Sequence, residues 1–149
     1  MIGVRVFPRS LQRDSFSCGT RSVFVVLQYF NRQLPYEEVF LKLKTDHNGT
    51  NVKPILNLFR KLGLKTGRRS HMTFKQLRKV LKYGGVAILD VDGDHFIVCH
   101  GVDLKEKRVY VADPAITRTF GSSISIKKLK KRWDRSGIVV GLSRKMPLT

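Results

Sequence analysis

Residues Gln12 to Gly19 bring a thiol and an amide together at the start of a predicted helix. Cys18 precedes a long apolar stretch, residues 22–30, and Gln12 stands six positions before Cys18. A thiol in the first turn of a helix meets unpaired backbone N–H groups and the positive end of the helix dipole, which favour the nucleophilic thiolate. The amide of Gln12 and the backbone N–H of Cys18 could together bind a developing oxyanion. This stretch therefore predicts the nucleophilic half of an acyl-transfer site.

A base and an orienting carboxylate are predicted in the second half of the chain. His95 opens a predicted strand over residues 96–102, and Asp113 closes the next strand, over residues 108–112. If residues 103–107 form the turn of a hairpin, the ends that carry His95 and Asp113 lie side by side. Asp113 could then accept a hydrogen bond from one ring nitrogen of His95, while the other nitrogen faces Cys18. A nucleophile, a base and an orienting residue are the parts of a thiol-dependent acyl-transfer site.

Each of these residues also has an ordinary explanation when it is taken alone. A lone buried cysteine is usually a small hydrophobic residue, and Asp113-Pro114 is a common way to open a turn. The combination of Gln12, Cys18, His95 and Asp113 at the starts and ends of predicted elements is more specific than any single residue. The second cysteine, Cys99, falls inside a predicted strand and is expected to fill the core.

No metal or cofactor is predicted. Asp90 to Asp94 resembles the start of a calcium loop, but the twelfth position of such a loop requires a glutamate and is Gly101 here. We therefore predict a β-turn beside His95. The other histidines have no metal-ligand spacing with the cysteines.

The elements that must position these residues follow from hydrophobic periodicity. The helix that begins at Cys18 is apolar on nearly all sides, which is typical of a helix enclosed by other elements. Thr73 and Gln76 form a predicted capping box at the start of a later helix. Helices are predicted over residues 18–31 and 126–133. Between them, one helix is predicted to begin at residue 35, a second to end at about residue 62 and a third to begin at residue 73. Strands are predicted over residues 86–91, 96–102, 108–112 and 138–142. Helices followed by an antiparallel meander favour an α+β fold.

The size and composition fit one domain over residues 1–149. Of the 149 residues, 42% are hydrophobic, which is enough for a single core. Neither a signal peptide nor an apolar run of about 18 residues is evident, so a cytoplasmic location is expected. The two cysteines are expected to be free thiols, and we expect a monomer.

The charge is far from balanced. Twenty-nine Lys and Arg residues against eleven Asp and Glu residues give a net charge of +18. The basic residues gather in residues 53–82 and 127–135. Such a surface attracts acidic polypeptides, anionic membranes or nucleic acid, although it can also be simply a solvated surface. A nucleic-acid-associated protein is a rival interpretation, but the chain has no reader motif.

These motifs resemble the papain-like cysteine peptidases of family C39, the bacteriocin-processing type. The resemblance covers nearly the whole chain. It is carried by Gln12, Cys18-Gly19, His95-Phe96-Ile97-Val98, His100-Gly101-Val102 and Val109 to Ala115.

The resemblance implies a papain-like α+β fold with Cys18 as nucleophile, His95 as base, Asp113 as orienting residue and Gln12 as oxyanion residue. It also implies a peptide substrate, in particular a leader peptide cut after Gly-Gly, and association with an ABC transporter. Association with the inner face of a membrane is a further expectation, because the basic surface would attract anionic lipids. The family usually has an acidic residue immediately before the cysteine, where this chain has Ser17. No transporter region follows in the sequence, so a stand-alone or excised domain is expected. A non-catalytic peptide-binding domain of the same fold is the alternative.

Overall fold

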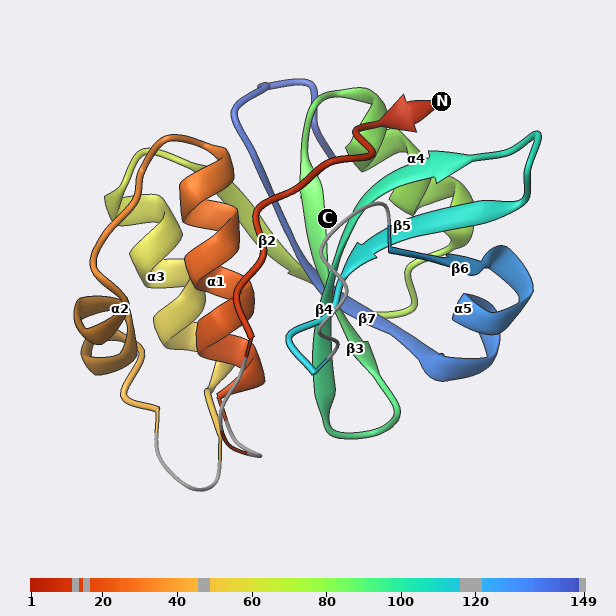
Figure 1. The fold of residues 1–149 in the computed structure, drawn as a ribbon. Helices are drawn as coiled ribbons and strands as arrows, with labels where there is room; N and C mark the ends of the chain where they lie inside the picture. Colours follow the sequence, from red (N-terminus) through yellow and green to blue (C-terminus); the bar gives the residue numbers. More distant parts are fainter. Residues whose placement is uncertain (12–13, 15–16, 46–48, 116–121, 148–149) are drawn as a thin grey trace.

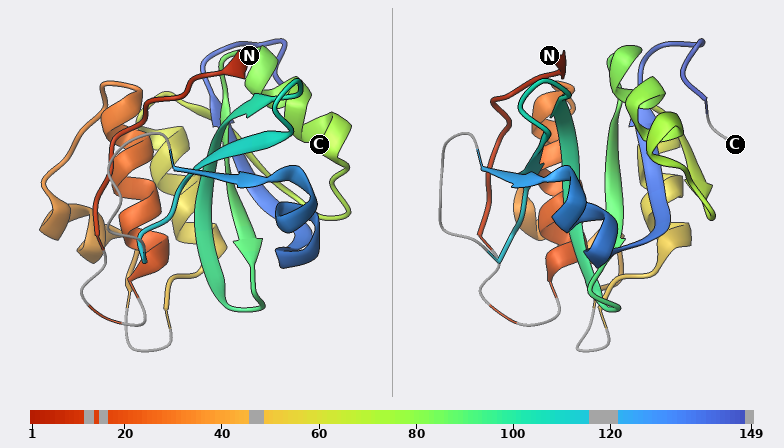
Figure 2. Two further views of the ribbon diagram at one scale, coloured as in Figure 1. Left: turned by 45° about the vertical axis from the view of Figure 1, so that its right-hand side comes forward. Right: turned by 90° about the vertical axis from the view of Figure 1, so that its right-hand side faces the viewer.

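One antiparallel sheet runs through the middle of the molecule, with helices on both of its faces (Figures 1 and 2). The computed structural model describes residues 1–11, 14, 17–45, 49–115 and 122–147. Among these, seven strands pair in the order β2-β7-β3-β4-β5-β6, and β1 pairs with β4. The strands are β1 (Ile2–Gly3), β2 (Lys65–Arg69), β3 (Val86–Val91), β4 (His95–Asp103), β5 (Arg108–Ala112), β6 (Ser123–Ser125) and β7 (Trp133–Gly141). The helices are α1 (Cys18–Tyr29), α2 (Tyr36–Lys42), α3 (Val52–Lys61), α4 (Phe74–Lys82) and α5 (Ile126–Arg132).

Helix α1 belongs to the helical layer that covers one face of the sheet. It packs against β4 and α2, and α3 packs against β2 and β7. Val23, Val26 and Leu27 of α1 have no exposed surface. They share a core with Val86 and Ile88 of β3. The prediction of an enclosed, cysteine-bearing helix is confirmed.

Helices α4 and α5 cover the opposite face. Ala87 and Leu89, the residues that alternate with Val86 and Ile88 along β3, belong to this second core. This alternation is expected of a strand that is buried on both faces. The predicted capping box is present at the start of α4, because the Thr73 hydroxyl accepts from the Gln76 backbone at 3.1 Å and the Gln76 side chain accepts from the Thr73 backbone at 2.8 Å.

The predicted meander is confirmed as β3, β4 and β5. Val91 pairs with His95 across the turn that joins β3 to β4, and Asp92 has a φ of 56° there. The β4–β5 register shifts between Cys99 and Gly101, which leaves His100 as an extra residue in β4. This β-bulge lies under the N-terminal segment, where the His100 carbonyl accepts from the Val4 backbone at 2.9 Å and the His100 Nδ1 lies 2.8 Å from the Val4 carbonyl oxygen.

Three strands were not predicted, and β7 is longer than expected. The sequence of β2, Lys-Thr-Gly-Arg-Arg, has no apolar alternation, so its place depends on pairing with β7 along its whole length. Strand β7 begins at Trp133 rather than at residue 138, and its first residues include polar Asp134 and Arg135. Helices therefore do not all precede the sheet in sequence, although the fold class remains α+β. None of the helices in the described part of the chain is long and apolar enough to cross a membrane.

Candidate active site

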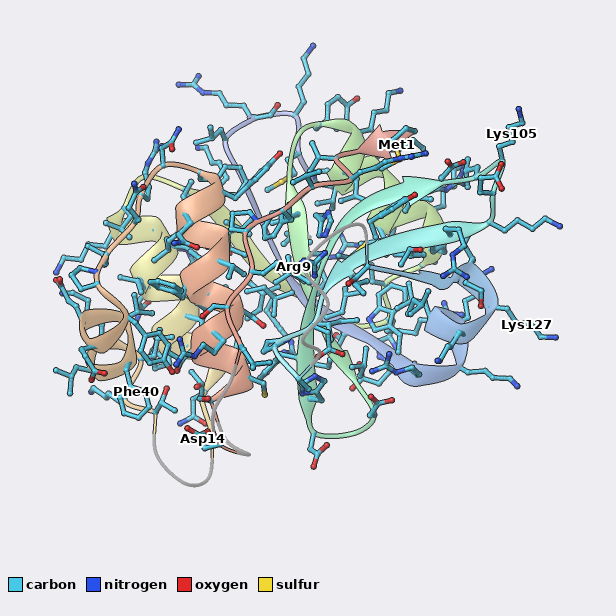
Figure 3. The ribbon with its side chains drawn as sticks, in the orientation of Figure 1. Met1, Arg9, Asp14, Phe40, Lys105 and Lys127 are labelled. Carbon is cyan, nitrogen blue, oxygen red and sulfur yellow. The ribbon has the colours of Figure 1, made fainter. Side chains whose placement is uncertain are left out.

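Cys18 is the first residue of α1 and is nearly buried, with 7% of its surface exposed. Among the residues that the structure describes, none is recorded as capping this helix with its side chain, and the first turn of the helix holds no acidic residue. Asp14 instead accepts a hydrogen bond from the Ser17 backbone at 2.7 Å, just before the helix (Figure 3). The carboxylate of Asp14 therefore anchors the residue that directly precedes α1. The N–H groups of the first turn remain beside the Cys18 thiol.

Gly19 allows the start of α1 to approach its neighbours closely. A Cβ atom built on Gly19 would lie 2.9 Å from the Thr50 Cβ and 3.4 Å from the Phe96 ring. Thr50 is in turn 2.8 Å from the Thr45 hydroxyl, which lies 2.6 Å from the hydroxyl of Thr20 in α1. Because Phe96 directly follows His95, this contact holds the thiol next to the strand that carries the predicted base.

His95 and Asp113 are in direct contact. The His95 Nε2 lies 2.7 Å from the Asp113 Oδ1. His95 is the first residue of β4, Asp113 directly follows β5, and the two strands pair as the sequence predicted. The same Asp113 oxygen accepts from the Ala115 backbone at 2.9 Å, which fixes the orientation of the carboxylate.

The environment of His95 favours the imidazolium form. The hydrogen bond to Asp113, followed by a hydrogen bond with the side chain of Cys18, raises the pKa of His95 to about 9 despite partial burial. Because Nε2 holds Asp113, Nδ1 is the nitrogen available to the thiol. The structure thus brings the three predicted residues Cys18, His95 and Asp113 together.

Arg132 links a second carboxylate, that of Asp92, to Asp113. Burial alone would raise the pKa of Asp113, but the hydrogen bonds from His95 and Ala115 and the charges of His95 and Arg132 lower it. The Arg132 Nη2 lies 3.9 Å from the Asp113 Oδ2. The Arg132 guanidinium also binds both oxygens of Asp92, with its Nη2 2.6 Å and its Nε 3.0 and 3.1 Å away.

Arg132 was not predicted as a site residue. In the sequence it is one member of a run of basic residues, 40 positions from Asp92, and nothing local distinguishes it. Its role follows only from the packing of α5 against the β3–β4 turn, where the Arg132 carbonyl also accepts from the Asp92 backbone at 2.9 Å. Asp92 was predicted to lie beside His95, and the structure shows that its carboxylate is held by Arg132.

Two further predictions concern Gln12 and Cys99. Gln12, the predicted oxyanion residue, lies outside the described residues. Cys99 has no exposed surface, and burial raises the pKa of its thiol to about 12, as expected of a core residue. Among the described residues, no three His, Cys, Asp or Glu side chains are grouped so that they could hold a metal ion.

The family follows from a match over nearly the whole chain. The model of the Peptidase C39 family matches residues 7–145, and the chain belongs to this family. A search of curated protein sequences found no significant match.

Solved structures share the fold. The chain is similar to a double glycine motif protease from an AMS/PCAT transporter, solved in complex with the leader peptide, with 22% identity over 93% of each chain and a TM-score of 0.79. It is also similar to the peptidase domain of Streptococcus ComA, a bifunctional ABC transporter of a quorum-sensing pathway, with 16% identity over 92% of this chain and 99% of that one and a TM-score of 0.77. The N-terminal peptidase C39-like domain of a toxin secretion ATP-binding protein from Vibrio parahaemolyticus is 13% identical, over 85% of this chain and 97% of that one, with a TM-score of 0.66. The predicted papain-like α+β fold is thereby confirmed.

Proposed function

We propose that this chain is a cysteine endopeptidase in which Cys18 is the nucleophile, His95 the general acid and base, and Asp113 the residue that orients His95. The observation that carries the proposal is the 2.7 Å contact between the His95 Nε2 and the Asp113 carboxylate, with the Cys18 side chain as a further cause of the raised pKa of the same imidazole. Family membership supports it, because the three residues fall in the matched region.

The proposed reaction begins with attack of the Cys18 thiolate on a peptide carbonyl. The resulting oxyanion accepts hydrogen bonds from the Cys18 backbone N–H and from the Gln12 amide. As the tetrahedral intermediate collapses, the C–N bond breaks and the His95 imidazolium protonates the departing amine. Neutral His95 then removes a proton from water, which attacks the thioester and releases the acid product and the Cys18 thiolate.

The proposed substrate is a leader peptide cut after a Gly-Gly pair. The support comes from the similar double glycine motif protease, which was solved with its leader peptide. The similar peptidase domain of ComA belongs to an ABC transporter, so an exporter is the proposed partner. Processing of an exporter's cargo takes place where the cargo is made, and a cytoplasmic location, with bacteriocin-type precursors as substrates, belongs to the same proposal.

Replacement of the nucleophile tests the proposal. We expect wild-type protein to cut a proteome-derived peptide library, with a preference for bonds after Gly-Gly, and Cys18→Ala to cut none of these bonds. The matched control is Cys99→Ala, which removes the other buried thiol and should retain cleavage. Mass spectrometry of the digests gives both the rate and the cut positions.

The outcomes separate the peptidase from its specificity. Equal cleavage by Cys18→Ala and wild type would overturn the peptidase assignment, whereas thiol-dependent cleavage without a Gly-Gly preference would overturn only the leader-peptide proposal. A non-catalytic peptide-binding domain would show no cleavage and slow alkylation of Cys18 by iodoacetamide near neutral pH.

A further inference from the structure

Helices α4 and α5 expose an unbroken set of basic side chains. Neither helix contains an acidic residue. Lys75, Lys79 and Lys82 of α4 are exposed, and so are the four lysines of α5. We call the set formed by these seven lysines and Arg78 the basic face; its members are Lys75, Arg78, Lys79, Lys82, Lys127, Lys128, Lys130 and Lys131.

The two helices meet at the ring of Phe74. The Lys130 Nζ lies 5.3 Å from the centre of this ring, and the Arg78 Cζ lies 5.7 Å from it. The chain leading into α4 is also bonded to β7, because the Met72 backbone donates to the Arg135 carbonyl at 2.8 Å. Two clusters that are about 50 residues apart in the sequence therefore form one surface.

The basic face has few acidic neighbours. Within the described part of the chain, none of its eight members forms an ion pair. The acids close in sequence have other partners, since Asp92 binds Arg132 and Asp134 accepts from the Ser136 backbone at 2.8 Å. Glu106, in the β4–β5 turn, is flanked by Lys105 and Lys107.

A hollow lies at the α5 end of this face, beside the β4–β5 turn. Its volume is about 650 Å³, and its lining residues are Lys107, Ser125, Ile126, Lys127, Lys130 and Lys131. The Ile126 backbone donates to the Lys107 carbonyl at 3.0 Å, which joins the hairpin to α5. Lys105 and Lys127 both extend into solvent on this side of the molecule (Figure 3). The lining of the hollow thus combines four lysines with one apolar side chain, Ile126.

We propose that the basic face binds the surface of an anionic lipid bilayer, with a phosphate-bearing headgroup in the hollow at α5. Clusters of basic residues on helices are attracted to anionic lipids, at about 1 kcal/mol for each residue near the surface. Seven of the eight residues are lysines, which act as point charges, whereas forked recognition of nucleic-acid phosphates is typical of arginine. Leu104, 45% exposed in the adjacent β4–β5 turn, supplies an apolar group.

This orientation turns α1, the helix that carries Cys18, away from the bilayer. Helix α1, with Cys18, belongs to the core on one face of the sheet, and α4 and α5 belong to the core on the other. Figure 2 shows α1 and α4 on opposite sides of the strands. The inference goes beyond the proposed peptidase function and does not depend on it.

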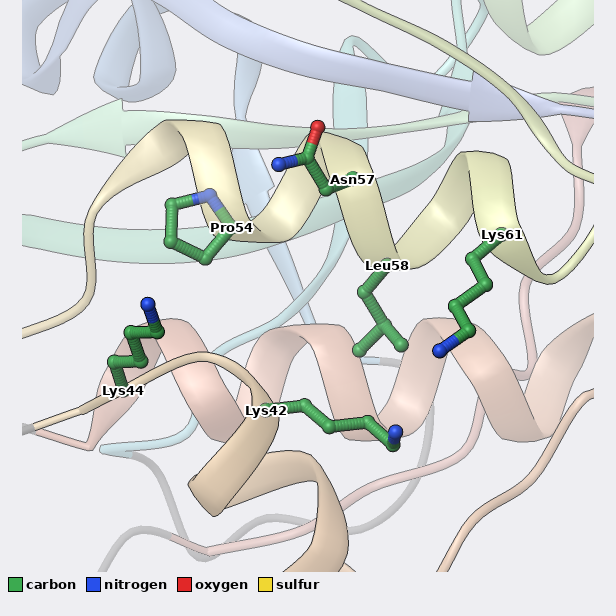
Figure 4. Close-up of a pocket in the computed structure, with 6 residues that line it drawn as sticks. All are labelled: Lys42, Lys44, Pro54, Asn57, Leu58 and Lys61. Carbon is green, nitrogen blue, oxygen red and sulfur yellow. The ribbon is translucent and has the colours of Figure 1, made fainter.

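A charge-reversal pair tests the proposal. One variant carries Lys127→Glu, Lys130→Glu and Lys131→Glu. The matched control carries Lys42→Glu, Lys44→Glu and Lys61→Glu, at a second lysine-lined pocket between α2 and α3 on the other face of the sheet (Figure 4). All six lysines are exposed, and each triple substitution changes the net charge equally. Circular dichroism melting establishes that both variants fold.

Co-sedimentation measures binding to vesicles of phosphatidylcholine alone and of phosphatidylcholine with phosphatidylglycerol, over a salt series. We expect wild-type protein and the α2–α3 control to bind the anionic vesicles and not the neutral ones. The α5 variant should bind at least about tenfold more weakly, because three lysines at the surface are lost. Peptide cleavage in solution, if present in the wild type, should be retained in both variants.

Three results would overturn the inference. Equal weakening of both variants would mean that net charge alone drives binding, and undiminished binding to neutral vesicles would exclude a role for the lipid charge. The third result concerns duplex DNA. If DNA displaced the protein from the vesicles and bound the protein more tightly than they do, and if this binding required the α5 lysines, nucleic acid would be identified as the partner.

Discussion

The protonation of His95 depends mainly on one carboxylate. Asp113 is the largest cause that raises the pKa of His95 to about 9, from an ordinary value of 6.5. On the proposed mechanism the reactive thiolate–imidazolium pair exists only while His95 holds its proton. Activity should therefore be present at neutral pH and decline as the pH rises through about 9.

Replacement of Asp113 should move this decline. We expect the alkaline limb of kcat/KM for Asp113→Asn to lie well below that of the wild type, because an amide does not stabilise the imidazolium as a carboxylate does. Measurement of kcat/KM across the pH range gives both limbs, and wild-type protein is the reference. An unchanged limb would mean that Asp113 does not set the pKa of His95.

Arg132 is expected to act as a positioning residue through Asp92 and Asp113. Arg132→Gln removes the contacts to both oxygens of Asp92 and the positive charge 3.9 Å from the Asp113 Oδ2. Because Asp92 is partly exposed, we expect a loss of only about 1 kcal/mol, or about fivefold, in kcat/KM. The pH below which kcat/KM falls because Asp113 becomes protonated should also rise, since Asp113 loses a nearby charge that lowers its pKa.

Arg135→Gln is the matched control for Arg132→Gln. Arg135 lies three positions further along, with its Cζ 5.8 Å from the Trp133 ring, so its replacement should change neither limb. A purely structural role for Arg132 would lower the melting temperature and leave the pH profile in place.

At the scale of elements, the β-bulge in β4 places a titratable ring in the core. His100 has no exposed surface, and its ring stacks on Phe7 at 4.7 Å. Burial lowers the pKa of His100 to about 4, so the folded protein holds the neutral ring at a pH where an unfolded chain would protonate it. The stability due to the neutral ring is present above pH 6.5 and is lost as the pH falls from there through about 4.

Urea unfolding at a series of pH values measures this loss. The two pKa values differ by an amount that corresponds to about 3 kcal/mol when the change is complete. His100→Asn can keep a donor to the Val4 carbonyl but does not titrate, so it should be less stable at neutral pH and lose less stability on acidification. Parallel pH profiles for the two proteins would contradict the assignment to His100.

Elements with their own apolar period were predictable, and elements defined by pairing were not. A local pattern of about ten residues is enough to recognise the helix at Cys18, the capping box at Thr73 and the strands of the meander. Strand β2 does not, because Arg68 and Arg69 belong to it through pairing with β7. The N-terminal segment likewise finds its place through the bulge at His100, which no local pattern indicates.

At the scale of the whole molecule, the candidate site was predictable where topology alone decides proximity. The hairpin of β4 and β5 is enough to join His95 to Asp113, and turn residues predict that hairpin. The contact of α5 with the β3–β4 turn depends on how a helix packs across the sheet, so the link from Arg132 to Asp92 could not be foreseen. The union of the two basic clusters at Phe74 depends on the same packing.

The division of the candidate site between two layers also sets an order of events during synthesis. Cys18 leaves the ribosome before its proposed base, His95, which follows 77 residues later, and Asp113 emerges later still. A domain generally folds as a unit, and it can do so only once its segments have emerged from the ribosome. The Cys18 thiol of the nascent chain therefore has no imidazole to accept its proton until the hairpin of β4 and β5 has been synthesised and has packed against α1. On the proposed mechanism, a ribosome-bound chain that ends before this hairpin holds the nucleophile but no peptidase, so the growing polypeptide is protected from its own active site.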